Sequence, residues 1–222
     1  MRAQRSPGRR HPQLVATIVV LVLTVLAAGC SSDKKVEPKR PLDTTPATPG
    51  AVVVSDDAMG YAVSIPPGWV RLPTEVRNFD AAADAVKAEA SPEARPAVTL
   101  GLVQLKSVVR SGAVLAAIDP ATGSTANLVT LGANGQKVSE VAIGAANRLI
   151  GNGAIDVTRT NVTVDGIEGV RQRFRTPFQT DAGPVNLNES QLYVVRRDHA
   201  YILTLTGESA DLDGIADSMR FA

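Results

Sequence analysis

Residues 171–175, with the sequence RQRFR, have the residue types and spacing that most clearly suggest binding chemistry. The arginines recur every second residue, and in a β-strand this period places Arg171, Arg173 and Arg175 on one face. Guanidinium groups spaced about 7 Å apart along a strand form charge-assisted hydrogen bonds with phosphate or carboxylate groups. We therefore predict that this face binds an anionic partner. The alternative is a solvated face whose arginines are paired with nearby acids such as Glu189.

Other residue patterns argue against metal, cofactor and nucleophilic sites. Besides His11 near the start, the sequence has one histidine, His199, and one cysteine, Cys30. A zinc or iron site needs several such ligands, so we expect no metal and interpret His199 as a surface residue of a turn. Gly-x-Ser-x-Gly does not occur, and no glycine-rich loop has the spacing of a nucleotide-binding loop. The sequence predicts a non-enzymatic protein without a cofactor.

Trp69, the only tryptophan, follows a Pro-Pro-Gly turn at the end of an expected strand. A tryptophan in this place folds back over a sheet, so we interpret it as an anchor in the core or at its rim. The alternative is an aromatic platform on which a ligand stacks. Trp69 therefore joins the three arginines as a candidate binding residue.

Cys30 stands at the border between an apolar and a polar segment. The chain begins with four arginines and no acidic residue, and the fifteen residues from Leu14 to Ala28 are uncharged and mostly apolar. This order is typical of an export signal. An uncleaved anchor helix is the alternative, but crossing a bilayer core takes roughly 20 apolar residues, which is more than this run contains.

The five residues that end at Cys30, LAAGC, resemble the lipobox of bacterial lipoprotein signals, although Ala27 stands where leucine is usual. The resemblance implies that the signal peptide, residues 1–29, is cleaved off and that Cys30 carries a diacylglyceryl group. More than one acyl chain gives stable anchoring, because each buried methylene contributes about 0.8 kcal/mol. The expected location is the outer face of the cytoplasmic membrane, with the membrane as a partner through the lipid.

Removal of the predicted signal also changes the charge balance. The whole chain has 23 basic and 22 acidic residues, and the loss of four arginines leaves 23 − 4 = 19 basic residues, a net charge of −3. A nearly neutral chain offers no electrostatic argument for nucleic-acid binding. We therefore expect no nucleic-acid partner.

The segment that follows Cys30 is rich in proline and polar residues. It has almost no large apolar side chains, so it cannot offset the entropy of becoming ordered. We predict a disordered tether over residues 30–51 and one folded domain over residues 52–222, which is long enough for a full core.

Alternation of apolar residues and turn signals predict the elements of this domain. In chain order, we expect a strand over 61–65, helices over 78–90 and 93–110, strands over 113–118 and 125–132, a helix over 139–150, strands over 155–164, 169–178, 185–196 and 200–207, a short helix over 210–217 and an extended end over 218–221. Strands in runs with grouped helices indicate an α+β domain with an antiparallel sheet.

This order of elements resembles the PsbP-like fold and, more closely, the LpqN/LpqT type of actinobacterial lipoprotein. The resemblance rests on a Pro-Gly-Trp turn after the first strand and on the segments TANLVTLG, GIEGVRQRF, HAYILTLTGE and DSMRF. It covers nearly all of residues 58–222 and implies an antiparallel sheet flanked by helices. It implies no catalytic residue, because the fold is known for partner-binding and assembly roles.

The sequence thus predicts a membrane-anchored lipoprotein of the cell envelope that binds an envelope lipid, polysaccharide or protein. Two alternatives stay open, namely an envelope hydrolase or transferase with an unmarked site and an accessory subunit of a membrane complex. A pocket with clustered acidic groups, or a strained serine beside His199, would favour the hydrolase. An exposed apolar patch would favour the subunit.

Overall fold

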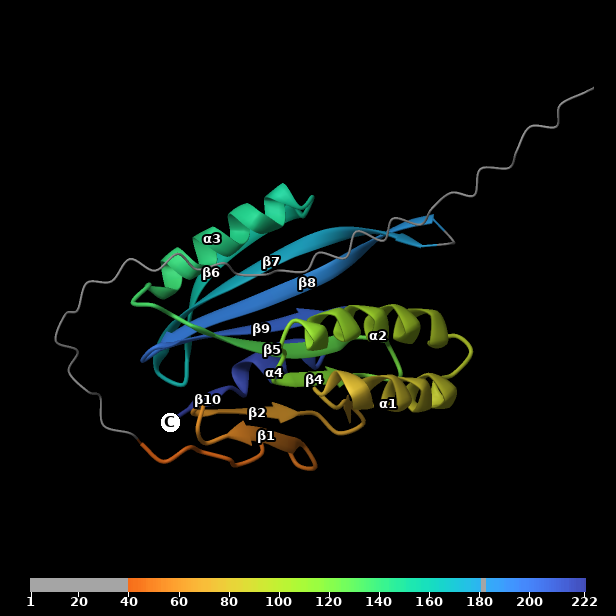
Figure 1. Cartoon of the computed structure of the whole chain (residues 1–222), viewed down its shortest axis with the longest axis horizontal. Coiled ribbons are helices and arrows are strands. Elements are labelled where there is room, and N and C mark those ends of the chain that lie inside the picture. The colour runs from red at the N-terminus through yellow and green to blue at the C-terminus, as the bar shows by residue number, and fades with distance from the viewer. Residues whose placement is uncertain (1–39, 181–182) are drawn as a thin grey trace, which may run out of the picture.

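The computed structural model describes residues 40–180 and 183–222, which form two antiparallel sheets and four helices (Figure 1). The larger sheet has seven strands in the order β3-β4-β5-β9-β8-β7-β6, and the smaller has three in the order β1-β2-β10. The strands are β1 Val52–Asp56, β2 Tyr61–Ile65, β3 Val70–Arg71, β4 Leu115–Ile118, β5 Thr125–Gly132, β6 Ile155–Val164, β7 Ile167–Thr180, β8 Gly183–Arg196, β9 His199–Thr206 and β10 Arg220–Phe221. The α+β class predicted from the sequence is confirmed.

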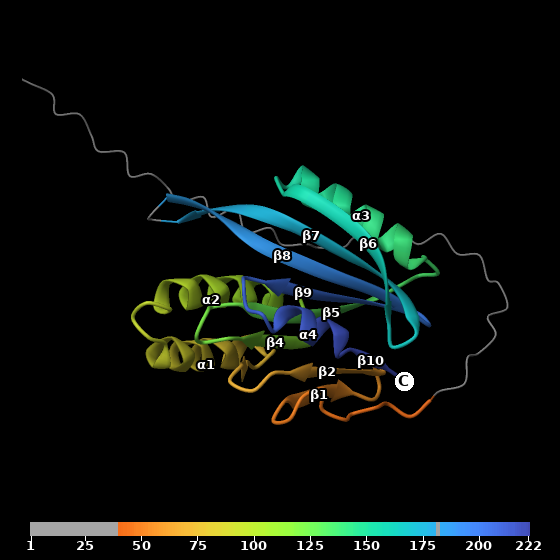
Figure 2. The same cartoon turned by 180° about the vertical axis from the view of Figure 1, so that it is seen from behind.

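Helices cover one face of the seven-stranded sheet in two separate groups. Helices α1 (Val76–Glu89) and α2 (Arg95–Arg110) pack over β4, whereas α3 (Val138–Gly151) packs over β7 and β8. The opposite face of the sheet is covered by the three-stranded sheet and by the short helix α4 (Leu212–Asp217). Figure 2 shows α3 and α2 on the same side of the sheet, with β8, β9 and β5 between them.

The close packing of α2 depends on Gly101. A Cβ atom at this position would lie 2.5 Å from the carbonyl oxygen of Gly123, in the turn between β4 and β5, and 2.9 Å from Cγ2 of Thr125. Such distances are shorter than any van der Waals contact, so only glycine lets the helix backbone approach the sheet this closely. This glycine, which weakens the helix pattern in the sequence, therefore has a packing role.

Strand β7 alternates between its two faces along the RQRFR segment. Gln172 and Phe174 are buried on the face that α3 covers, whereas Arg171, Arg173 and Arg175 lie on the opposite face. The period of two therefore places the arginines together, as we predict from the sequence. Their surroundings depend on α4, which packs against that face.

Residues 40–51, which the sequence predicts as part of the tether, precede the first strand and form polar contacts with the domain. Nε of Arg40 donates a hydrogen bond of 2.7 Å to the carbonyl oxygen of Phe221, and Arg40 also forms an ion pair with Asp165. The backbone N–H of Ala47 donates to Oγ of Ser64 at 3.0 Å. These three polar contacts join Arg40 and Ala47 to residues of the domain, although the segment 40–51 has few apolar side chains.

The structure also has two short strands, β1 and β3, that the sequence patterns do not predict as strands. The predicted signal peptide, Cys30 and residues 31–39 lie outside the described residues. Within the described part of the chain, no helix is long and apolar enough to cross a membrane.

Candidate functional site

Arg171 links β7 to α4 through two ion pairs. Its Nη1 lies 3.1 Å from Oδ1 of Asp213, and its Nη2 lies 2.8 Å from Oδ1 of Asp217. The Arg171 side chain is only 12% exposed, and its buried Nε has no hydrogen-bond partner among the described residues. Arg171 therefore holds the helix on the sheet and is poorly accessible to a ligand.

Arg173 and Arg175 are more exposed, and each is also paired with a carboxylate. Nη2 of Arg173 lies 3.1 Å from Oδ1 of Asp213, while Arg175 pairs with Asp156. Asp156 lies where the pairing of β6 with β7 shifts its register, and its φ of 55° is a conformation that aspartate tolerates better than most residues. The irregular start of β6 thus brings a carboxylate to Arg175.

Acidic residues therefore pair with all three arginines, as in the alternative interpretation of this face, but Glu189 is not their partner. The strand register places Glu189 directly opposite Phe174, so the two side chains share a face that the arginines do not. Burial raises the pKa of Glu189, and a hydrogen bond with Thr176 partly opposes that effect.

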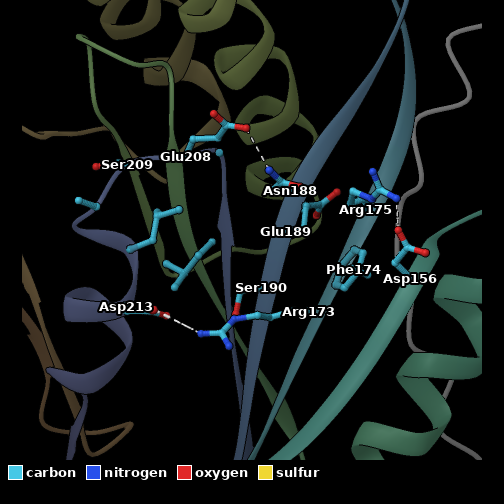
Figure 3. Close-up of a pocket in the computed structure, with 14 residues that line it drawn as sticks. Asp156, Arg173, Phe174, Arg175, Asn188, Glu189, Ser190, Glu208, Ser209 and Asp213 are labelled. Atoms are coloured by element: carbon cyan, nitrogen blue, oxygen red, sulfur yellow. Dashed lines mark hydrogen bonds and ion pairs between the residues drawn. The ribbon is translucent and has the colours of Figure 1, made fainter.

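A pocket of about 430 Å³ lies between the strands β7 and β8 and the segment 207–213 that leads into α4 (Figure 3). Its lining combines charged, polar and apolar groups. The residues that line it are Asp156, Arg173, Phe174, Arg175, Asn188, Glu189, Ser190, Leu205, Gly207, Glu208, Ser209, Ala210, Leu212 and Asp213. Nδ2 of Asn188 donates a 3.1 Å hydrogen bond to Oε1 of Glu208 across this pocket.

The electrostatics of the pocket favour a polar ligand over a free anion. Each of its two guanidinium groups is already neutralised by a carboxylate, so an anion would have to compete with Asp156 or Asp213. Hydroxyl groups can instead accept from the remaining N–H groups and donate to the carboxylate oxygens without breaking either pair. In the described part of the chain, no group of His, Cys, Asp and Glu side chains is arranged to hold a metal ion.

Neither Trp69, the fourth candidate binding residue, nor His199 is among the residues that line this pocket. Trp69 is half-buried against the core between the two sheets, and its Nε1 donates a 3.3 Å hydrogen bond to Oδ2 of Asp211. His199 is the half-buried first residue of β9, with its ring centroid 6.2 Å from that of Tyr201. Among the described residues, no serine hydroxyl forms a hydrogen bond with His199, so the geometry of a serine nucleophile is not assembled there.

Sequence patterns did not identify most of the polar residues that line the pocket. Asp156, Asn188, Glu208 and Asp213 come from four separate segments, and none of them follows a period or a motif. The hairpin signals do place β7 beside β8, which would have suggested Asn188 and Ser190 as cross-strand neighbours of the arginines. No pattern in the sequence predicts that α4 packs against β7.

No family model and no curated protein matches this chain. Among solved structures, it is similar to cyanobacterial PsbP (CyanoP) from Synechocystis, with 12% identity, a TM-score of 0.46 and coverage of 78% of this chain and 93% of that one. A protein from Bacteroides thetaiotaomicron has 8% identity and a TM-score of 0.42, with coverage of 82% of this chain and 48% of that one. LpqN, a Mycobacterium tuberculosis protein involved in cell envelope biogenesis, has 11% identity and a TM-score of 0.38, with coverage of 76% and 84%. At these identities the likeness concerns the fold alone.

Proposed function

We propose that this chain is a lipid-anchored protein of the cell envelope whose domain binds an envelope component without catalysing a reaction. The support for the anchor is the order of arginine-rich start, apolar run and Cys30 in the sequence. The support for binding is the pocket beside β7, whose lining combines hydrogen-bond donors and acceptors with apolar side chains. The domain would then act on the outer side of the cytoplasmic membrane.

Among an envelope lipid, a polysaccharide and a protein, the pocket fits a polysaccharide best. The observation that carries this choice is that Arg173 and Arg175 are both paired with carboxylates inside the pocket. Such pairs hold planar groups of donors and acceptors in place, and neighbouring hydroxyls of a sugar ring can bind them two at a time. The proposed role is therefore recognition of a hydroxyl-rich chain end or segment.

Binding can be tested with the full chain in a neutral detergent and the soluble polysaccharide fraction of the source envelope. Asn188→Ala removes an amide from the pocket, and Asn161→Ala is a matched control because Asn161 is also an exposed asparagine on a strand. We expect calorimetry to show weaker binding for Asn188→Ala only. Equal binding by the parent and both variants would place recognition elsewhere.

The anchor needs a separate test, because the described residues do not include Cys30. Cys30→Ala should abolish incorporation of a labelled fatty acid and partition of the mature protein into the detergent phase. Ser31→Ala, next to the cysteine, is the control that should leave both unchanged. Labelling of the Cys30→Ala variant would contradict the proposed lipid attachment.

A hydrolase that acts on the same class of ligand is the second candidate. It is favoured by the four carboxylates in the pocket and by the raised pKa of Glu189, since a general acid must stay protonated near its working pH. Incubation of the polysaccharide with the full chain distinguishes the two functions. Binding without shortening of the chains supports recognition, whereas shortening that Glu189→Gln abolishes would support the hydrolase.

A further inference from the structure

Glu189 differs from the other acidic residues that line the pocket beside β7. Two arginines and four acidic residues line this pocket, so the formal charge of its lining is 2 − 4 = −2. Asp156 and Asp213 form ion pairs with the arginines, which leaves the carboxylates of Glu189 and Glu208 without a cation among the described residues. The pocket therefore carries unbalanced negative charge.

The two remaining carboxylates are not equally exposed. Glu208 is exposed, so water and the 3.1 Å hydrogen bond from Nδ2 of Asn188 stabilise its charge. Glu189 is half-buried, and burial raises the pKa of its carboxyl group, which only a hydrogen bond with the neutral Thr176 opposes. A carboxylate withdrawn from water costs free energy unless a cation compensates it. Glu189 is thus the carboxyl group of the lining that is both withdrawn from water and unpaired with a cation of the described residues.

An aromatic ring lies next to this carboxyl group. Phe174 of β7 stands directly opposite Glu189 of β8, and both residues line the pocket (Figure 3). Directly opposite side chains of an antiparallel pair point to the same face, with Cβ atoms about 4.5–5.5 Å apart. The π-electrons of an aromatic ring attract an ammonium group, and a carboxylate forms charge-assisted hydrogen bonds with it. Together the two side chains favour an ammonium group over a neutral hydroxyl group.

The end of β9 opens this pair of side chains to the pocket. Thr206, the last residue of β9, lies opposite Glu189, and residues 183–188 of β8 pair with β7 alone. Beyond Thr206 the chain bends at Gly207, whose φ is 116°, and continues as a wall of the pocket. A ligand in the pocket can therefore contact Glu189 as well as the paired arginines on the other face of β7.

The neighbouring ion pairs determine which other groups the ligand carries. Phe174 lies between Arg173 and Arg175 in the chain, and successive residues of a strand are about 3.3 Å apart. The two guanidinium groups, already paired with Asp213 and Asp156, bind hydroxyl groups in the proposed polysaccharide recognition. A sugar ring with an amine beside a hydroxyl group presents both kinds of group within the span of these residues.

We propose that Glu189 and Phe174 bind a protonated primary amine of the ligand, so that the pocket recognises an amino sugar with a free amine. The inference rests on the proposed polysaccharide recognition and names the class of sugar unit. The ammonium group donates charge-assisted hydrogen bonds to the carboxylate and balances part of the negative charge of the lining. An N-acetylated amine carries no charge, so it leaves Glu189 without a cation.

Calorimetry with the full chain in a neutral detergent tests this choice with three probes. They are the tetramer of glucosamine, the tetramer of N-acetylglucosamine and the amide of Nα-acetyl-lysine. We expect the glucosamine tetramer to bind about tenfold or more tightly than the N-acetylated tetramer, because only the free amine forms hydrogen bonds in which both partners are charged. Glu189→Gln should abolish this preference. Glu168→Gln removes the same charge from an exposed position of β7 outside the pocket and should keep the preference.

A second variant tests the aromatic ring. Phe174→Leu keeps an apolar side chain but removes the ring, so it should weaken binding of the glucosamine tetramer about threefold and leave that of the N-acetylated tetramer unchanged. This variant decides the matter if Glu189→Gln does not fold.

The outcomes separate this inference from the proposed function. Equal affinities for the two tetramers, or a preference that a folded Glu189→Gln keeps, would overturn the amine site, whereas weaker binding of the envelope polysaccharide by Asn188→Ala would still support the proposed function. Tighter binding of the lysine amide than of the glucosamine tetramer would overturn the amino sugar in favour of a peptide. Absence of binding by all three probes would overturn the inference, and the titration with the envelope polysaccharide would then decide the proposed function by itself.

Discussion

Replacing Arg171 by glutamine should destabilise the domain, whereas the same replacement at Arg173 should barely do so. The two arginines lie two residues apart on the same face of β7 and share Asp213 as a partner. Their exposure differs, because the side chain of Arg171 is 12% exposed and that of Arg173 is 57% exposed. Only Arg171 also reaches Asp217, and thereby ties both ends of α4 to the sheet.

The size of the effect follows from the two ion pairs of Arg171. Its partners Asp213 and Asp217 are 62% and 71% exposed, so solvent screens each pair, and about 0.5–1 kcal/mol per pair is reasonable. The loss of both pairs then lowers the free energy of unfolding by about 1–2 kcal/mol. In a domain of this size, that corresponds to a decrease in Tm of roughly 2–8 °C. For Arg173 we expect less than about 0.5 kcal/mol.

Thermal and urea denaturation of the full chain, followed by circular dichroism, would measure both variants. A double-mutant cycle of Arg171→Gln with Asp217→Asn should give a coupling energy of about 0.5–1 kcal/mol. The same cycle of Arg173→Gln with Asp217→Asn is the control and should give a value near zero. Equal destabilisation by the two arginine variants would refute the view that Arg171 holds α4 while Arg173 is free to serve a ligand.

Three further predictions concern other parts of the fold. Gly101→Ala should lower the free energy of unfolding, measured by urea denaturation, by about 1–3 kcal/mol, because the added Cβ would overlap the β4–β5 turn. Gly151→Ala is the control and should lower it little, because the space around Gly151 is open. Equal destabilisation by the two variants would contradict the packing role of Gly101. Because burial raises the pKa of Glu189, the native state holds its proton more tightly than the unfolded state, and stability is lost as pH rises from the usual pKa of about 4 through the native value. Glu189→Gln should therefore have a higher Tm than the parent at pH 7 and the same Tm below about pH 4, and a pH-independent difference would refute this linkage. A chain that begins at residue 52 should melt below one that begins at residue 40, because it lacks the contacts of Arg40 and Ala47. Identical melting would show that these contacts do not stabilise the domain, as expected of a tether that ends at residue 51.

Local patterns in the sequence were sufficient to predict the class of the fold and which side chains share a face of a strand. The period of two in residues 171–175 depends only on the geometry of one strand, so it placed the three arginines together without knowledge of their neighbours. Hairpin signals such as Asp165-Gly166 likewise join strands that are adjacent in the chain, and the structure pairs β6 with β7 at that turn. The strand β1 was missed because the segment that holds it begins beside a polar, proline-rich stretch.

Only the tertiary structure decided which side chains meet. Arg171 and Asp217 are 46 positions apart, and Arg40 and Asp165 are 125 apart, so no local period relates either pair. The pocket beside β7 likewise exists only because the segment that leads into α4 lies against β7 and β8. Pairing across such separations depends on how whole helices and sheets pack, and packing follows the sum of many weak apolar contacts rather than any single motif.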